Sequence, residues 1–175
     1  IILGGIEASL RRIAHYDYWS DTVRRPILID AKADLLVFGM GERPIWEVTQ
    51  RLQAGEPIGR IRDVRGTCFA LSQAEADALC AQPSQHVGDG RVVELPRYEE
   101  VCGKDPAALA SYAKMARKFH FETNPKNARP LVQRVGQRGA LGHPLEPIAA
   151  AVGGCHRLAG ALDGAKRGRW PVAEA

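Results

Sequence analysis

Apolar and polar positions follow two different periods along the chain, and these periods set the elements that the sequence predicts. Short, nearly continuous apolar runs at residues 1–3 and 33–38 are each followed by a glycine turn, which indicates buried strands. Residues 7–14 and 42–53 carry apolar side chains three or four positions apart, which is typical of amphipathic helices. The chain therefore opens with two strand–turn–helix units.

A third helix has clear start and stop signals. Asp105 and Pro106 have the residue types of an N-cap and a first helical position, and Asn124-Pro125 ends the pattern after about residue 122. The helical spacing also predicts the faces that point into the core. For the three helices in turn, these faces carry Ile6, Leu10 and Ile13; Ile45, Val48 and Leu52; and Leu109, Tyr112, Ala116 and Phe119.

The remaining elements of the first 136 residues give weaker signals. Ser72 and Glu75 have the spacing of a capping box, which predicts a short helix through Cys80. We interpret residues 128–135 as another short helix. Short apolar stretches near glycine or proline favour strands or extended segments at residues 26–29, 59–64, 66–71 and 92–95.

Strand–turn–helix units predict an α/β fold, here a partial Rossmann-like open sheet with parallel strands and flanking helices. The chain opens inside an apolar strand and without a methionine, so we expect the sheet to be incomplete at its N-terminus. Residues 1–136 form the predicted domain. Residues 137–175 are rich in Gly, Ala, Pro and Arg, and we expect poor order there, or a helix over residues 147–162 that lacks a good core face.

Composition places the chain among globular proteins. Of its 175 residues, 45% are hydrophobic and 25% are charged, and the net charge is +4. No apolar run reaches the ~20 residues that cross a bilayer, and no signal-peptide pattern is present, so we expect a cytoplasmic protein with reduced thiols. The basic residues are scattered, which is typical of a solvated surface; a nucleic-acid face is the alternative.

The cysteines give no metal or catalytic pattern. Cys68, Cys80, Cys102 and Cys155 all lie more than ten residues apart, so they match neither a zinc site nor a small disulfide scaffold. The chain also lacks a G-x-S-x-G nucleophile motif. We therefore predict no metal site and no catalytic residues.

The two glycine turns are the first candidate site, because ligands in open α/β sheets lie at the carboxyl ends of strands. Two observations favour tight structural turns instead. Pro44 stands where a G-x-G-x-x-G motif needs its third glycine, and Glu42 adds negative charge at a helix start where a phosphate would bind. Both interpretations stay open. The candidate ligand-facing residues are Gly4, Gly5, Glu7, Gly39, Gly41 and Glu42.

An aromatic and basic cluster follows the first predicted helix. Arginine and aromatic side chains together hold a phosphate or a nucleobase through forked hydrogen bonds and stacking. The alternative is a buried aromatic joint in which Asp17 and the arginines satisfy the polar groups. The candidate substrate or nucleic-acid contacts are Arg11, Arg12, His15, Tyr16 and Trp19.

This cluster belongs to a longer run with a family resemblance. Residues 4–21 read GGIEASLRRIAHYDYWSD, which resembles the N-terminal region of the YgiQ family of radical SAM proteins. Further agreement extends the resemblance over about residues 1–136. It lies at residues 30–36, 63–67, 121–125 and 128–129.

The resemblance implies a domain that precedes a radical SAM barrel. In the family that barrel carries C-x-x-x-C-x-x-C, which binds a [4Fe–4S] cluster that reduces S-adenosylmethionine. The motif is absent here, and so is the D-x-H-x-x-G signature of cobalamin-binding domains. We therefore expect a fragment without a cofactor of its own, not catalytic alone, whose partner is the barrel of the same parent chain. A nucleotide- or nucleic-acid-binding α/β module is the alternative function.

Overall fold

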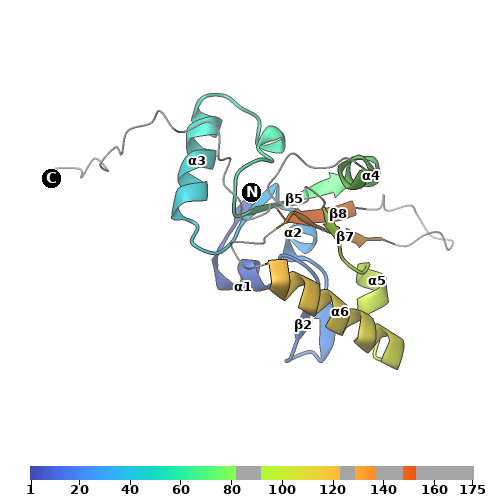
Figure 1. Ribbon diagram of the computed structural model, residues 1–175. Helices are drawn as coiled ribbons and strands as arrows, with labels where there is room; N and C mark the ends of the chain where they lie inside the picture. Colours follow the sequence, from blue (N-terminus) through green and yellow to red (C-terminus); the bar gives the residue numbers. More distant parts are fainter. Residues whose placement is uncertain (82–91, 123–128, 137–147, 153–175) are drawn as a thin grey trace.

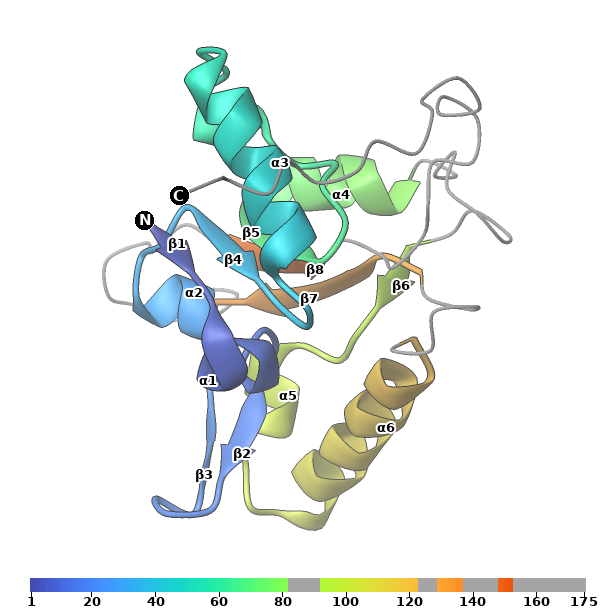
Figure 2. The same ribbon diagram turned by 90° about the vertical axis from the view of Figure 1, so that its left-hand side faces the viewer.

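A computed structural model describes residues 1–81, 92–122, 129–136 and 148–152. Within these residues (Figure 1), six strands form one sheet in the order β1-β4-β5-β8-β7-β6, and all six are labelled in Figure 2. The strands are β1 (Ile2–Leu3), β4 (Leu35–Val37), β5 (Thr67–Ser72), β6 (Val93–Glu94), β7 (Leu131–Val135) and β8 (Ile148–Val152). A separate two-stranded hairpin joins β2 (His15–Asp17) to β3 (Thr22–Arg24).

The sheet is mixed, which corrects part of the predicted Rossmann-like parallel arrangement. The outer pairs β1–β4 and β6–β7 are parallel, but the three inner pairs are antiparallel. The cause is visible between β4 and β5. Residues 54–66 return the chain to the carboxyl end of β4, where the amide of Phe38 donates to the carbonyl of Gly66 at 2.9 Å. β5 therefore starts beside the end of β4 and runs back along it.

Helices cover both faces of the sheet, as the sequence predicts for an α/β fold. Figure 2 shows two helices on one side, α3 (Glu42–Gln53) and α4 (Gln73–Ala81). The other side carries α1 (Gly5–Leu10), α2 (Ile27–Asp30), α5 (Tyr98–Val101) and α6 (Pro106–Glu122), and the hairpin extends beyond them. A 3-10 turn, η1 (Ile58–Arg60), precedes β5.

The core is divided between the two faces because neighbouring strand residues point in opposite directions. Leu36 of β4 belongs to the core under α1, α2, α5 and α6, whereas Leu35 and Val37 belong to the core under α3. Val132 packs with Leu71 and with Ala76 of α4. Every residue of β4 is therefore buried, which explains why this strand shows as a continuous apolar run in the sequence.

Gln133 joins three segments inside the core. Its side chain is completely buried in β7, and its Oε1 accepts a hydrogen bond from the amide of Ala14 at 2.7 Å. Its Nε2 donates to the carbonyl of Pro96 at 3.1 Å and lies 3.0 Å from Sδ of Met115. A buried amide with both ends bonded satisfies backbone groups that would otherwise lack partners.

The caps of the two predicted helix starts are confirmed. Oδ1 of Asp105 accepts hydrogen bonds from the amides of Ala107 and Ala108, each at 3.0 Å, so Asp105 is the N-cap of α6. At α4, the amide of Glu75 donates to Oγ of Ser72 at 3.3 Å, and the amide of Ser72 donates to Oε2 of Glu75 at 2.8 Å. This is the reciprocal pattern of a capping box.

Other predicted elements are wrong. Residues 27–30 form a short helix, in which the carbonyl of Pro26 at the N-cap accepts hydrogen bonds from the amides of Ile29 and Asp30. Residues 131–135 form a strand that is buried on both faces. Its polar residues Gln133 and Arg134 are hydrogen-bonded to Pro96 and Glu94. Those two polar residues interrupt the apolar run, so the sequence pattern does not indicate a central strand there.

The buried face predicted for the first helix is confirmed only at Ile13, which lies after the end of α1. Ile6 is 81% exposed and Leu10 is exposed, while Ala8 is buried against the sheet. Helix α1 has only six residues, so a glycine turn and strand pairing fix its orientation more strongly than its own apolar spacing. On α3, Val48 is buried as predicted, whereas Ile45 and Leu52 are exposed. On α6, Tyr112 and Phe119 pack against the core as predicted, Leu109 and Ala116 are exposed, and Met115 is the fully buried residue.

The sheet continues beyond residue 136. Strand β8 pairs with β5 on one side and with β7 on the other, so it lies between them, whereas the sequence favours a helix or poor order there. The rest of the predicted tail, residues 137–147 and 153–175, lies outside the described residues. Across the described part of the chain, no helix has the length and apolar character needed to span a bilayer.

Candidate functional site

The two glycine turns lie side by side at one end of the sheet. Strands β1 and β4 are parallel neighbours, so their carboxyl ends meet, and the amide of Gly39 donates to Oγ of Ser9 at 3.3 Å. Gly5 and Gly39 have φ values of +89° and +72°, a region that disfavours residues with a side chain. Gly4 and Gly41 complete the two turns.

The surroundings of these turns do not resemble a phosphate site. Glu7 and Glu42 are exposed in the first turns of α1 and α3, where a carboxylate stabilises the helix and repels an anion. Ile6 and Met40 are 81% and 88% exposed beside them. This end of the sheet therefore presents carboxylates and apolar side chains, a mixture that suits an apolar or basic protein surface.

The two candidate arginines are engaged within the domain. Arg11 donates to Oδ2 of Asp30 at 2.9 Å and to the carbonyl of Arg25 at 3.1 Å, and a third contact joins it to Glu7 at 3.6 Å. These bonds link α1 to α2 and leave little of the Arg11 side chain exposed. Its charge is already matched by carboxylates.

Arg12 lies between two aromatic rings. Its guanidinium carbon is 4.5 Å from the ring centre of Phe38 and 4.3 Å from that of Phe119, and the guanidinium also donates to the carbonyl of Ser9. Burial lowers the pKa of Arg12. The side chain therefore joins the end of β4 to α6, and it is not presented to a ligand in solution.

His15, Tyr16 and Trp19 belong to the β2–β3 hairpin and not to a buried joint. His15 is half-buried opposite Arg24, whereas Trp19 is 93% exposed near the hairpin turn. Asp17 accepts hydrogen bonds from the amide of Trp19 at 3.0 Å and from Nε of Arg24 at 2.9 Å. The structure thus separates the five candidate residues instead of bringing them into one site.

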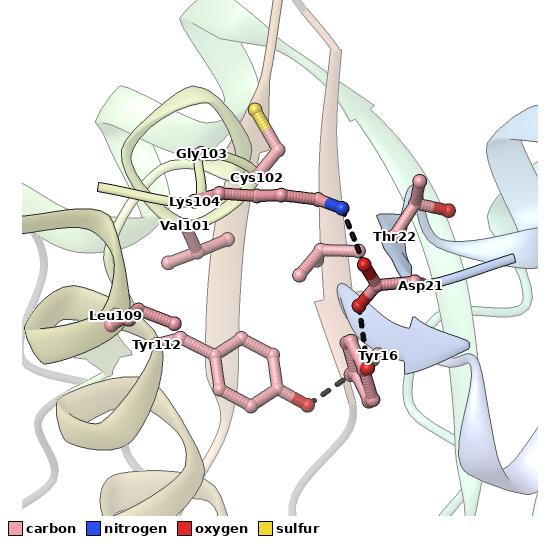
Figure 3. A pocket seen from close by; sticks show the side chains of 10 residues that line it. Tyr16, Asp21, Thr22, Val101, Cys102, Gly103, Lys104, Leu109 and Tyr112 are labelled. Atoms are coloured by element: carbon pink, nitrogen blue, oxygen red, sulfur yellow. Dashed lines mark hydrogen bonds and ion pairs between the residues drawn. The ribbon is translucent and has the colours of Figure 1, made fainter. Parts of the chain in front are cut away.

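A pocket of about 440 Å³ opens between the hairpin and helices α5 and α6 (Figure 3). Val23, Val101 and Leu109 provide apolar lining. Tyr16 from the hairpin and Tyr112 from α6 face each other across it, and the amide of Tyr16 donates to the hydroxyl of Tyr112 at 3.1 Å. This volume lies within the ~300–1,000 Å³ of typical ligand pockets.

An ion pair crosses the mouth of this pocket. Nζ of Lys104 lies 2.5 Å from Oδ2 of Asp21, and the hydroxyl of Tyr16 donates to Oδ1 of Asp21 at 2.8 Å (Figure 3). The hydrogen bonds from Lys104 and then Tyr16 lower the pKa of Asp21. The same bond to Asp21 raises the pKa of Tyr16. At neutral pH the mouth therefore carries one carboxylate and one ammonium group.

Sequence reasoning singled out Tyr16 of this pocket but missed Asp21, Lys104 and Tyr112. Asp21 and Lys104 lie 83 positions apart in the chain, so no local spacing signals their contact. Of these three residues, the sequence pattern indicates only Tyr112, as part of a helix face.

The cysteines do not fit an iron–sulfur cluster. Cys68 is completely buried in β5, where burial raises its pKa to about 12. Cys80 lies on α4, across the sheet from exposed Cys102 at the end of α5. Among the described residues no group of three His, Cys, Asp or Glu side chains is arranged to hold a metal ion. Cys155 lies outside those residues.

Fold and site together define a small mixed α/β domain whose candidate pocket is lined by apolar side chains, two tyrosines, the Asp21–Lys104 ion pair and Cys102. A profile of the radical SAM N-terminal family matches residues 1–151, and the chain belongs to that family. The match ends one residue before the end of strand β8. It therefore extends fifteen residues past the boundary at residue 136 that composition suggested.

Curated relatives confirm the resemblance to the YgiQ family. The chain is 50% identical to the UPF0313 protein GSU2873 of Geobacter sulfurreducens, with 82% of the chain and 21% of that protein aligned. It is 51% identical to the UPF0313 protein RPA0679 of Rhodopseudomonas palustris, with 79% of the chain and 21% of that protein aligned. It is 41% identical to the UPF0313 protein YgiQ of Escherichia coli K12, with 79% of the chain and 24% of that protein aligned.

The chain thus spans about a fifth to a quarter of the length of the curated relatives it matches. No solved structure gives a significant match to it.

Proposed function

We propose that this chain is the N-terminal accessory domain of a larger YgiQ-type radical SAM protein and does not carry out radical chemistry alone. The observation that carries the proposal is the family match over residues 1–151, combined with relatives that are four to five times longer than the matched part. In such a parent the [4Fe–4S] cluster and S-adenosylmethionine belong to a separate barrel, which supplies the radical chemistry.

The cysteine chemistry supports this division. A cluster of this kind needs several thiolates converging on one point. Cys68 is held as a buried thiol, and Cys80 and Cys102 lie on elements at opposite faces of the sheet. The described residues therefore supply structure and contact surface to the parent.

We place the contact with the rest of the parent at the two glycine turns. Exposed Ile6 and Met40 flank these turns, and large apolar side chains at such exposure are typical of surfaces that another domain covers. In this proposal Gly4, Gly5, Gly39 and Gly41 let the partner backbone approach closely, and Glu7 and Glu42 pair with basic groups at the rim. The partner is the barrel of the same parent chain.

The nucleic-acid alternative receives less support. It depends on Arg11 and Arg12 as phosphate contacts, and both guanidinium groups are bonded inside the domain. Exposed Trp19 and Tyr18 remain on the hairpin, but the neighbouring cations Arg24 and Lys104 are already paired with Asp17 and Asp21, which weakens their attraction for a polyanion.

A reconstitution experiment tests the catalytic part of the proposal. The chain and full-length YgiQ of Escherichia coli are incubated with iron and sulfide under anaerobic conditions, and visible absorption and S-adenosylmethionine cleavage are measured. We expect both signals from the full-length protein and neither from the chain. A cluster spectrum or cleavage by the chain would overturn the proposal.

A binding experiment tests the contact surface. The part of Escherichia coli YgiQ beyond its matched region is immobilised, and binding of the chain is measured. We expect the double substitution Ile6→Ser and Met40→Ser to weaken binding at least tenfold. Leu52→Ser with Phe121→Ser, which removes exposed apolar groups from the last turns of α3 and α6, is the matched control. Equal weakening by both pairs, or by neither, contradicts this surface.

A further inference from the structure

An exposed ion pair with little effect on stability lies at the mouth of the pocket between the hairpin and α6. Asp21 and Lys104 pair at 2.5 Å, but their side chains are 67% and 70% exposed. Exposed ion pairs contribute little to stability, so this pair opens at small cost. Each charged group is then available to a molecule that enters the pocket.

The connection before α6 keeps Lys104 at this position. A Cβ atom on Gly103 would lie 2.7 Å from Oδ2 of Asp105 and 2.9 Å from Cβ of Ala108, so only glycine fits there without a shift. Asp105 in turn caps α6. The backbone of Lys104 is therefore fixed by the helix start, while its exposed side chain can turn from Asp21 to a ligand.

The hydroxyl of Tyr112 is a further donor in the lining of the pocket. The hydroxyl oxygen of Tyr112 accepts the amide proton of Tyr16, and within the described parts of the chain nothing accepts the proton of that hydroxyl. This proton can be donated to a bound acceptor. The lining contributed by Val23, Val101 and Leu109 is apolar and suits a hydrocarbon body.

Charge matching selects the class of ligand. A cationic molecule would pair with Asp21 but would be repelled by Lys104. An anionic molecule would pair with Lys104 but would be repelled by Asp21. A neutral molecule would form an ion pair with neither group. A zwitterion satisfies both at once. We propose that this pocket binds a small zwitterion with an apolar body, the chemistry of an apolar α-amino acid, with its ammonium at Asp21 and its carboxylate at Lys104 and Tyr112.

The first test uses the unchanged chain, so it does not depend on the folding of any variant. Binding of L-leucine is measured by calorimetry and by the ring resonances of Tyr16 and Tyr112, and compared with two analogues. Isoamylamine lacks the carboxylate, and isocaproate lacks the ammonium. We expect leucine to bind at least tenfold more tightly than either analogue, with shifts at both tyrosine rings.

Two substitutions assign each charge to its partner. Asp21→Asn should remove the preference for leucine over isocaproate, and Asn tolerates the φ of +48° at this position. Lys104→Met should remove the preference over isoamylamine while keeping an aliphatic chain. Glu100→Gln and Lys114→Met make the same charge changes at exposed positions outside the pocket and should leave both preferences intact.

Three results would overturn the proposal. These are no binding of leucine or phenylalanine at millimolar concentration, equal affinity for leucine and its analogues, or preferences that persist in both pocket variants with circular dichroism like that of the unchanged chain. The outcome is independent of the proposed accessory function, which the iron–sulfur experiment tests separately.

Discussion

A single amide side chain, Gln133, satisfies backbone groups from two segments far apart in the chain. Replacing it by Leu keeps the volume but leaves the amide of Ala14 and the carbonyl of Pro96 without their bonds. Because each buried unpaired group costs about 1–3 kcal/mol, we expect Gln133→Leu to lower the free energy of unfolding by about 2–4 kcal/mol. Urea denaturation measures it, and Gln50→Leu at an exposed position of α3 is the control. Equal stability of the two variants would refute this role.

Cys68 and Cys102 should differ sharply in reactivity. The thiolate is the reactive form, and burial raises the pKa of Cys68 to about 12, while Cys102 is exposed at the end of α5. We expect iodoacetamide at pH 8 to label Cys102 in the native protein and Cys68 only after denaturation. Peptide mapping by mass spectrometry distinguishes the two sites. Rapid native labelling of Cys68 would contradict its burial.

The arginine pair shows what a sequence reveals at the scale of residues. The types and order of Arg11 and Arg12 are sufficient to nominate them as contacts. Their partners, Asp30 for one and the rings of Phe38 and Phe119 for the other, come from distant segments. Residue type therefore predicts the interactions that a side chain can make, and the tertiary fold decides which of them it makes.

At the scale of elements, the N-cap of α6 provides a measurable contribution. Asp105→Ala removes the acceptor for the amides of Ala107 and Ala108. We expect a loss of about 1 kcal/mol in unfolding free energy, within the ~0.5–2 kcal/mol typical of such caps. Asp105→Asn keeps a capping oxygen and should retain most of the stability. Equal unfolding free energies for the Ala and Asn variants in chemical denaturation would contradict this capping role.

The capping box of α4 should make stability depend on pH. Hydrogen bonds from Arg62 and Ser72 lower the pKa of Glu75 from 4.5 to about 2. Because the folded value is depressed, the contribution of Glu75 is present above pH 4.5 and is lost as pH falls from about 5 toward 2. Glu75→Gln should flatten that part of the profile of unfolding free energy against pH. Parallel profiles for the two proteins would exclude this contribution.

Elements with local signals were predicted well, and elements defined by distant neighbours were not. Helices α3 and α6 begin and end where caps, proline and glycine place them. Strand β8 reads IAAAV, in which the three central alanines have little strand preference, and it is a strand because β5 and β7 pair with it on both sides. The pairing partner β5 lies more than seventy residues before β8, so this pairing cannot be inferred from the local period.

At the scale of the whole molecule, the domain should end after β8. A chain that ends at residue 136 lacks the strand between β5 and β7, and the facing edges of these strands lose their partners. We expect this chain to lose cooperative unfolding, whereas one that ends at residue 152 keeps every described element. Circular dichroism during thermal unfolding compares the two. A cooperative transition in the shorter chain would support a boundary at residue 136.

The candidate pocket belongs to this same scale. Its carboxylate comes from a hairpin turn and its ammonium from the connection before α6, so neither the charge pair nor the apolar lining exists before the hairpin docks on the helices. The family and most helices could be predicted from the sequence, because both depend on the local order of residues. The pocket could not be predicted, because it forms only when the distant hairpin and helices come into contact.

The position of β8 also governs how the domain assembles during synthesis. Strand β5 leaves the ribosome about eighty residues before its partner β8, and β7 leaves shortly before it. Until β8 arrives, the growing chain holds two separate half-sheets whose facing edges have free backbone groups. Closure of the sheet is thus a late event that depends on the last described strand. A pause in translation before that strand would prolong the interval in which these edges can pair with other chains.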